Sequence, residues 1–166
     1  KLLGPAQATK SGLGSVSLEL GAGVKVAALV AVNAFGDVLD LESGRILAGT
    51  RGPDGFVDTA RSMLNASRVG GFAENTTIGV VATNANLTVE GANKVAQMAH
   101  DGLARTISPI HTMLDGDTIF ALATGEVEAD VNVVGTAAAR AMAIAVNRAV
   151  LKAAAAGGLP AAADLG

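Results

Sequence analysis

The sequence predicts one domain of mixed α and β structure. Two early segments have strand patterns, two later segments carry apolar residues at helical spacing, and 166 residues suffice to bury one core. Half of the residues are hydrophobic, yet the chain has only four Phe and no Trp or Tyr. We therefore expect a core of small side chains, in which helices and strands approach one another closely.

The first two predicted strands form a hairpin. Residues 14–20 alternate polar and apolar side chains, which is the period of a strand with one buried face, and residues 24–33 are more completely apolar. Gly21-Ala22-Gly23 lies between them and provides a tight turn. Residues 35–55 are interrupted by Gly, Asp and Pro, and this pattern predicts one or two short strands among loops.

The middle of the chain predicts a short helix, a linker and a buried strand. Residues 56–64 have apolar side chains at helical spacing after Asp54. Residues 65–74 combine Gly-Gly with small polar residues, which is typical of an exposed segment open to cleavage. Residues 77–82 are an apolar run that predicts a buried strand.

Two longer helices are predicted in the second half of the chain. Thr88 is a candidate N-cap for a helix to about residue 107, which Pro109 ends. Residues 118–123 predict another strand. Residues 131–156 predict an alanine-rich helix whose polar side chains share one arc, so its apolar face should lie against a sheet. Residues 157–166 are expected to form a loose tail.

Composition narrows the range of partners. The formal net charge is -3 and the chain has no cluster of Lys and Arg, which argues against nucleic acid as the main partner. The absence of Cys excludes disulfides, a thiolate nucleophile and a Cys-ligated metal. Arg140, Arg148 and Lys152 interrupt the longest apolar stretch, which argues against a membrane span. We expect a small-molecule or peptide substrate, no membrane and no cofactor.

The sequence Asn75-Thr76-Thr77 stands at the entrance of the predicted strand over residues 77–82. A threonine hydroxyl is a weak nucleophile unless a base lies beside it, and a threonine at the start of a chain can use its own α-amino group. That amine has a reference pKa of roughly 7.7 to 8, so on the order of one molecule in five is unprotonated at neutral pH. From spacing alone, however, an ordinary turn followed by strand residues is the favoured interpretation.

Asp115 and Asp117 form a second candidate feature. They lie two residues apart, so in an extended segment both side chains can point to the same side. Two neighbouring carboxylates repel one another, and such a pair could hold an ammonium or a hydroxyl group. The alternative is a solvated Asp-Gly-Asp turn. A Ca²⁺ site is not indicated, because Ca²⁺ needs six or more oxygen ligands and no further acidic residues flank the pair.

Asn33 is a third candidate, at the polar end of an otherwise apolar strand. Its carboxamide could donate to a developing oxyanion, a role worth about 3 kcal/mol in the transition state. Alternatively, it caps the turn that follows. His100 and His111 do not indicate a Ser-His-Asp triad, since no Gly-x-Ser-x-Gly motif accompanies them.

Two long runs, "ENTTIGVVATNANLT" and "KVAQMAHDGLARTISPIHTMLDGDTIFALATG", closely resemble the family of L-aminopeptidase/D-esterases, β-peptidyl aminopeptidases and nylon-oligomer hydrolases. The upstream run "KSGLGSVSLELGAGVKVAALVAVNAFGDV" is similar too, so the resemblance spans nearly the whole chain. These are self-cleaving N-terminal-nucleophile enzymes. The resemblance implies the four-layer α/β/β/α fold of the DmpA/ornithine acetyltransferase type, made as an inactive precursor that cuts itself once.

The resemblance implies cleavage between Asn75 and Thr76, with Thr76 as the nucleophile and its new amino group as the base. Threonine is the nucleophile in the nylon-hydrolase branch, whereas the aminopeptidase branch has serine. The Asp-x-Asp of the same branch matches Asp115 and Asp117, which are expected to orient the nucleophile or the substrate amine. Asn33 matches the family's asparagine near the oxyanion.

A lysine before the "GLGS" stretch also belongs to the family's active site. Lys1 is the better match by its spacing, and Lys10 is the alternative. Family members carry a long segment before this region, which completes the sheet layers and one wall of the substrate pocket. We therefore expect only the C-terminal portion of the full fold, which by itself should not form four layers.

The resemblance also implies a subunit organisation. Residues 1–75 are expected to end the larger (alpha) subunit, and residues 76–166 to form the smaller (beta) subunit after self-cleavage, the two together making one domain. A homo-oligomer, a tetramer, is expected in the cytoplasm.

The leading hypothesis is a threonine amidohydrolase for short amino-terminated amides, such as 6-aminohexanoate oligomers or small peptides. A β-peptidyl aminopeptidase, an L-aminopeptidase or a D-esterase is an alternative within the family. Acyl transfer is a further alternative, because ornithine acetyltransferase uses a related fold. The non-enzymatic alternative is a binding module in which Asn75-Thr76 is only a turn.

Overall fold

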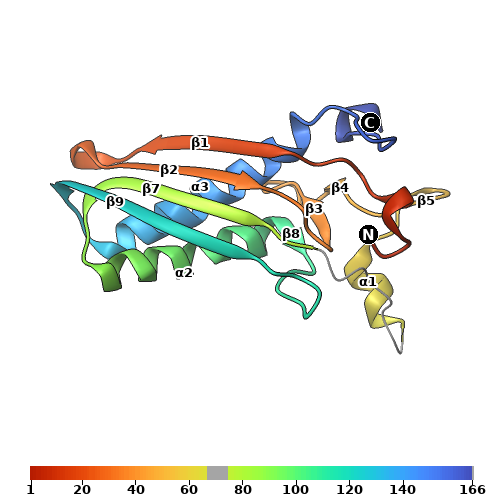
Figure 1. Cartoon of the computed structure of the whole chain (residues 1–166), viewed down its shortest axis with the longest axis horizontal. Coiled ribbons are helices and arrows are strands. Elements are labelled where there is room, and N and C mark those ends of the chain that lie inside the picture. The colour runs from red at the N-terminus through yellow and green to blue at the C-terminus, as the bar shows by residue number, and fades with distance from the viewer. Residues whose placement is uncertain (67–74, 166) are drawn as a thin grey trace.

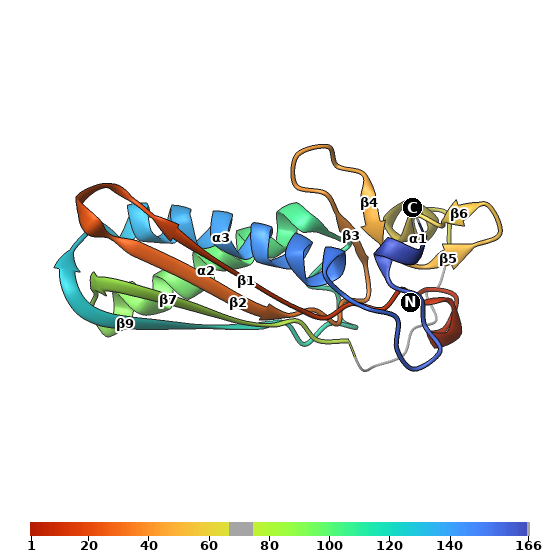
Figure 2. The ribbon, with the colours of Figure 1, turned by 90° about the horizontal axis from the view of Figure 1, so that it is seen from above.

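The centre of the protein is a four-stranded sheet covered on one face by two long helices (Figures 1 and 2). The computed structural model describes residues 1–66 and 75–165. The strand order is β1-β2-β7-β9, and the elements are β1 (Leu13–Glu19), β2 (Lys25–Ala31), β7 (Ile78–Asn86), β9 (Thr118–Glu128), α2 (Val89–Thr106) and α3 (Val131–Leu151). This arrangement confirms the predicted α+β class.

The predicted hairpin is confirmed. β1 and β2 pair antiparallel from Leu13 opposite Ala31 to Glu19 opposite Lys25, and a 3-10 turn at Gly21–Gly23 joins them. β7 pairs antiparallel with β2 on the side away from β1. The paired residues run from Val26 opposite Thr83 to Ala31 opposite Ile78.

The pairing of β7 with β9 positions the candidate residues. The two strands are parallel, with Ile78 opposite Thr118, and α2 lies in the connection between them. Parallel neighbours need such a crossover, and they start at the same end of the sheet. The segments that enter the two strands therefore meet, and Asn75 forms an isolated parallel bridge with Asp115.

Short elements gather at one end of the sheet, near both ends of the described chain (Figure 1). They are β3 (Asp37–Leu39), β4 (Ile46–Ala48) and β8 (Ile107–Ser108) in one sheet, β5 (Arg51–Gly52) and β6 (Gly55–Phe56) in a hairpin, and α1 (Thr59–Leu64). Short strands were predicted in the region of β3 to β6, but no strand was predicted at the position of β8.

Helix boundaries differ from the prediction at two ends. α1 begins at Thr59, not after Asp54, because the side chain of Asp58 caps it by accepting a hydrogen bond from Arg61 N at 3.0 Å. The N-cap Thr88 of α2 is confirmed, since its side chain accepts from Gly91 N at 3.1 Å. α3 ends at Leu151, five residues before the predicted end at residue 156.

The prediction of a loose C-terminal tail is wrong for the residues that the structure describes. Lys10 N donates to Pro160 O at 2.8 Å, and Lys10 forms a parallel bridge with Ala161, which is buried. A 3-10 turn follows at Ala162–Asp164. The predicted linker over residues 65–74 lies, from residue 67 on, outside the described residues.

Small residues let α3 pack closely on its neighbours. A Cβ on Gly14 of β1 would lie 1.9 Å from Ala145 O, and a Cβ on Gly102 of α2 would lie 2.3 Å from Ala139 O. Both contacts are with backbone, so only glycine permits the close approach.

α3 is long and apolar enough to cross a membrane, but 72% of its most apolar window is buried inside the protein, as expected for a core helix.

The sheet face opposite the helices carries exposed apolar side chains. These are Leu13, Leu29, Ile78, Phe120 and Leu122, which are 50 to 68% exposed. The register places Leu29, Val80 and Phe120 in one row across three strands. The described residues thus form one helix layer and one sheet layer, as expected for a portion of a four-layer fold.

The buried carboxylate of Asp37, in β3, links Thr50 to the start of α1. Asp37 is 1% exposed and accepts hydrogen bonds from Thr50 N (3.1 Å), Thr59 N (2.6 Å) and Thr59 Oγ1 (2.8 Å). Because Thr59 is the first residue of α1, this contact fixes the start of that helix. Removal of the carboxylate leaves three buried donors without their acceptor, which is costly in free energy.

We predict that Asp37→Ala lowers the free energy of unfolding by about 2 to 4 kcal/mol. Asp40→Ala is the matched control: Asp40 also accepts two bonds, from Ser43 N at 2.8 Å and from Ser43 Oγ at 2.6 Å, but in a solvated turn. Its effect should be clearly smaller, because water replaces the lost acceptor. Urea unfolding of both variants measures the difference, and equal losses would show that Asp37 has no special role.

Candidate active site

Thr76 lies between two buried residues at the entrance to β7. Asn75 and Thr77 are 1% and 0% exposed, whereas Thr76 is half-buried. Thr76 N donates to Asn33 O at 3.0 Å, and Thr76 Oγ1 donates to Asn75 O at 2.7 Å. The hydroxyl of the predicted nucleophile therefore touches the carbonyl oxygen of the bond that is predicted to break.

Asp117 holds the residue after Thr76. Its Oδ1 accepts from Thr77 N at 2.8 Å, and its Oδ2 lies 3.1 Å from His111 Nδ1. The Asp117 side chain is 1% exposed, so its bond with Thr77 N is shielded from water, whereas His111 is itself 39% exposed. Shielding strengthens hydrogen bonds to a charged group. Asp117 thus fixes the backbone immediately beyond the predicted nucleophile.

Asp115 holds the other side of the site. Its Oδ1 accepts from Phe35 N at 3.2 Å, and its Oδ2 accepts from Thr112 N at 3.2 Å and from Thr112 Oγ1 at 2.7 Å. Phe35 follows Asn33 by two residues. The carboxylate therefore joins the segment after β2 to the loop before β9, and the alternative of a solvated Asp-Gly-Asp turn is wrong.

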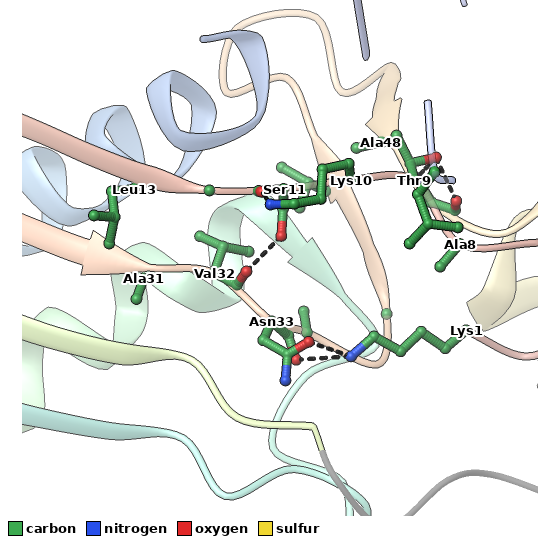
Figure 3. Close-up of a pocket in the computed structure, with 16 residues that line it drawn as sticks. Lys1, Ala8, Thr9, Lys10, Ser11, Leu13, Ala31, Val32, Asn33 and Ala48 are labelled. Carbon is green, nitrogen blue, oxygen red and sulfur yellow. Dashed lines mark hydrogen bonds between the residues drawn. The ribbon is translucent and has the colours of Figure 1, made fainter. Parts of the chain in front are cut away.

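Lys1 and Asn33 meet beside Thr76. The Lys1 ammonium Nζ donates to the side-chain Oδ1 of Asn33 and, at 3.4 Å, to its backbone oxygen (Figure 3). The backbone nitrogen of Lys1 donates to Phe35 O at 3.0 Å and to Thr50 Oγ1 at 2.8 Å, which holds the lysine in place. Burial lowers the pKa of Lys1, and the negative charge of Asp115 partly opposes this shift.

Lys10 lies elsewhere. Its Nζ donates to Ser11 O, and both lysines line a pocket of about 420 Å³ that also includes Asn33 (Figure 3). Thr76 and the two aspartates are not in the lining of this pocket. The pocket therefore adjoins the predicted active site through Lys1 and Asn33, and of the two lysines Lys1 is the one that contacts Asn33.

Two contacts at this site involve residues that the sequence did not point to. His111 was considered only as part of a triad, yet it has a left-handed backbone (φ 55°) and places Nδ1 against Asp117. Its ring centroid lies 4.9 Å from that of His100, and the pKa of His100 is lowered by burial and by the charge of His111. Gly116 N donates to Asn75 O at 2.8 Å.

The arrangement has the components of acyl transfer. A hydroxyl, a carbonyl and an N–H donor converge at the Asn75–Thr76 bond, with an ammonium and a carboxamide beside them. Within residues 1–66 and 75–165, no three His, Asp or Glu side chains are grouped as metal ligands.

Comparison with known proteins decides the family. The sequence model of peptidase family S58 matches residues 5–162. The chain belongs to peptidase family S58. This S58 chain is 43% identical over 174 residues to a Mycobacterium leprae protein named as an uncharacterized aminopeptidase, a match that covers 91% of the chain and 47% of the relative. The chain thus spans about half the length of that relative.

A shorter sequence match and two solved structures extend the comparison. A 6-aminohexanoate-oligomer endohydrolase of Kocuria sp. is 41% identical over 56 residues, which cover 34% of the S58 chain and 16% of the relative. The L-aminopeptidase D-Ala-esterase/amidase of Ochrobactrum anthropi, described as a variant of the Ntn hydrolase fold, aligns with a TM-score of 0.63 at 19% identity over 93% of this chain and 44% of its own.

A β-aminopeptidase of Burkholderia sp. aligns with a TM-score of 0.60 at 23% identity, over 86% of the S58 chain and 42% of its own. At these identities the likeness establishes the fold alone. It confirms the predicted fold type, and the S58 chain corresponds to less than half of either solved chain.

Proposed function

We propose that this S58 chain is part of an amide hydrolase that cuts its own Asn75–Thr76 bond and then uses Thr76 as its N-terminal nucleophile. The observation that carries the proposal is the 2.7 Å contact between Thr76 Oγ1 and Asn75 O, in a segment held by Asn33 and Asp117. Membership of a peptidase family and relatives named as aminopeptidases support it.

Self-cleavage supplies the base that the hydroxyl lacks. Before cleavage, Thr76 N is an amide that donates to Asn33 O at 3.0 Å. Once the bond breaks, the same nitrogen becomes an α-amino group, and its reference pKa of roughly 7.7 to 8 lets part of it act as a base at neutral pH. The α-amino group of Thr76 is therefore available as a base only after the chain has been cut.

Turnover then follows as covalent catalysis. Thr76 Oγ1 attacks the substrate carbonyl, its proton passes to the α-amino group, and the substrate amine leaves with that proton. Water releases the acyl group and restores the hydroxyl. The Asn33 carboxamide and the Lys1 ammonium, which contact one another, supply donors for the negative charge that develops on the carbonyl oxygen.

The proposed substrates are short amides with a free amino end, such as 6-aminohexanoate oligomers or small peptides. The relative named as a 6-aminohexanoate-oligomer endohydrolase supports the first class, and relatives named as aminopeptidases support the second. A panel of both classes, together with β-peptides and a D-amino acid ester, distinguishes them. Addition of a free amine to the same assays separates hydrolysis from acyl transfer.

The state of the purified full-length protein tests the proposal. We expect two associated chains, with Thr76 as the first residue of the smaller one, in intact-mass measurement and N-terminal sequencing. Active protein that consists of a single uncut chain would rule out the proposed mechanism, and a stable uncut chain without activity would favour a binding module.

The two lysines allow a matched prediction. We expect Lys1→Met to lower kcat about 10²-fold, because a donor near the developing oxyanion is lost. Lys10→Met should change kcat little, since the Lys10 ammonium donates to Ser11 O and not to Asn33. Steady-state kinetics on the best substrate of the panel measures both. Equal effects would contradict the assignment of Lys1.

A further inference from the structure

We propose that the backbone N–H of Gly116 is a catalytic donor that stabilises the oxyanion of self-cleavage. The inference rests on the proposed function, because it assigns a group to the same bond-breaking step. Gly116 N donates to Asn75 O at 2.8 Å, and Thr76 Oγ1 contacts the same oxygen at 2.7 Å. A donor is thus already in place at the carbonyl that must become negative.

The reaction places its charge on this oxygen. As Thr76 Oγ1 bonds to the Asn75 carbonyl carbon, the carbonyl electron pair moves to Asn75 O. The hydroxyl proton passes to the Thr76 nitrogen, the C–N bond breaks, and an ester with a free amine remains. Water then cleaves the ester to an Asn75 carboxylic acid and the Thr76 hydroxyl. The N–H bond to Asn75 O strengthens as negative charge develops, so it lowers the barrier.

The donor is held rigidly by the residues on each side of it. Asp115 accepts three hydrogen bonds, from Phe35 N and from Thr112, and Asp117 accepts from Thr77 N. Asn75 and Asp115 are bridged as parallel partners. A donor fixed before the reaction costs no reorganisation when charge appears. The two aspartates therefore act partly as positioning residues for the amide between them.

The identity of residue 116 agrees with this role. Gly116 is not among the glycines with a positive φ in the described chain, so its backbone conformation is open to other residues. A Cβ there, however, would lie 2.9 Å from Thr76 Oγ1 and 3.8 Å from Asn75 O. A side chain at this position would therefore press on the reacting hydroxyl, which glycine avoids.

Replacement of the Gly116 amide by an ester tests the donor directly. Glycolic acid, introduced at position 116 by in vitro translation of the full-length protein, removes the N–H without adding an atom near Thr76. We expect self-cleavage to slow by about 10²-fold, the cost of losing one oxyanion donor. The matched control is the same ester at Gly44, whose N–H donates to Asp40 O at 2.9 Å in a distant turn. It should cleave at the wild-type rate.

The outcomes separate the two proposals. If the all-amide protein never cleaves, the proposed function fails. If it cleaves and the Gly116 ester cleaves equally fast, the role of Gly116 is disproved while the proposed function stands. A crystal structure of the uncut Thr76→Ala protein is a second measurement that does not depend on the ester folding: Gly116 N should lie within hydrogen-bonding distance of Asn75 O, and a separation beyond about 3.5 Å would also disprove the role.

A steric test uses ordinary mutagenesis. Gly116→Ala keeps the N–H but places a methyl group against Thr76 Oγ1, so self-cleavage should slow more than about tenfold. Gly21→Ala is the control, because among the described residues beyond its chain neighbours no atom lies within 4 Å of a Cβ at that turn. Full-rate cleavage by Gly116→Ala would show that this loop does not lie against the reacting hydroxyl.

Discussion

Thr76→Ala is expected to leave the protein as one uncut chain without detectable amide hydrolysis. The reason is that a single hydroxyl is the attacking group in both reactions, first on the Asn75 carbonyl and then on the substrate. The neighbouring hydroxyl of Thr77 is not expected to replace it, since Thr77 Oγ1 is fully buried. Loss of a covalent nucleophile lowers kcat by about 10⁴-fold or more. Intact mass and a hydrolysis assay measure the two effects on the same sample.

Two variants control this result. Thr76→Ser keeps the hydroxyl, so it should still be cut and active. Thr124→Ala removes an exposed hydroxyl of β9 that contacts only Glu126 among the described residues, at 2.9 Å, and should behave as wild type. If Thr76→Ala were cut normally, another residue would perform the self-cleavage. If it stayed uncut but hydrolysed amides, the nucleophile of turnover would lie elsewhere.

Local patterns predicted the elements of this fold well where nearby residues define the element. The alternation over residues 14–20, the turn at Gly21-Ala22-Gly23 and the N-cap Thr88 all depend on neighbours within a few residues, and all three are confirmed. The two-residue strand β8 has no such pattern, because it is defined by pairing with β3. The C-terminal residues looked unstructured in sequence, yet Ala161 is buried by contacts with the distant Lys10 segment.

The candidate site depended on contacts that no local pattern contains. Asn75 and Asp115 are forty residues apart in the sequence. They meet because β7 and β9 are parallel and start at the same end of the sheet. Spacing alone therefore favoured the interpretation of each as an ordinary turn. The resemblance to a family pointed to residues that lie together in the fold, but it included neither His111 nor the Gly116 amide, whose contacts with Asp117 and Asn75 arise only in the folded chain.

Asp117→Asn is the second variant for which we expect a large effect. The carboxylate accepts from Thr77 N at 2.8 Å and faces His111 Nδ1 at 3.1 Å, and it is 1% exposed. A carboxamide has one acceptor and one donor, so it can keep the bond from Thr77 N only by turning its NH₂ group to His111. With His111 Nδ1 as the acceptor of that NH₂ group, the geometry is retained while the buried charge is lost.

We expect this change to slow self-cleavage and kcat about 10²-fold, because a negative charge beside the site stabilises the positive charge that the Thr76 amine acquires as it accepts a proton. Asp101→Asn, an exposed change on α2 with the same loss of charge, should have no effect on either rate. Wild-type rates for Asp117→Asn would show that the charge is not needed.

His111→Gln shows how much of the Asp117 effect passes through the histidine. Alone, it should reduce kcat less than Asp117→Asn does, since the negative charge of Asp117 remains beside Thr77 N. In a double-mutant cycle, a carboxylate that acts only through His111 would make Asp117→Asn harmless in the His111→Gln background. We expect instead that most of the loss persists there, because the buried charge acts directly on the segment that carries Thr76.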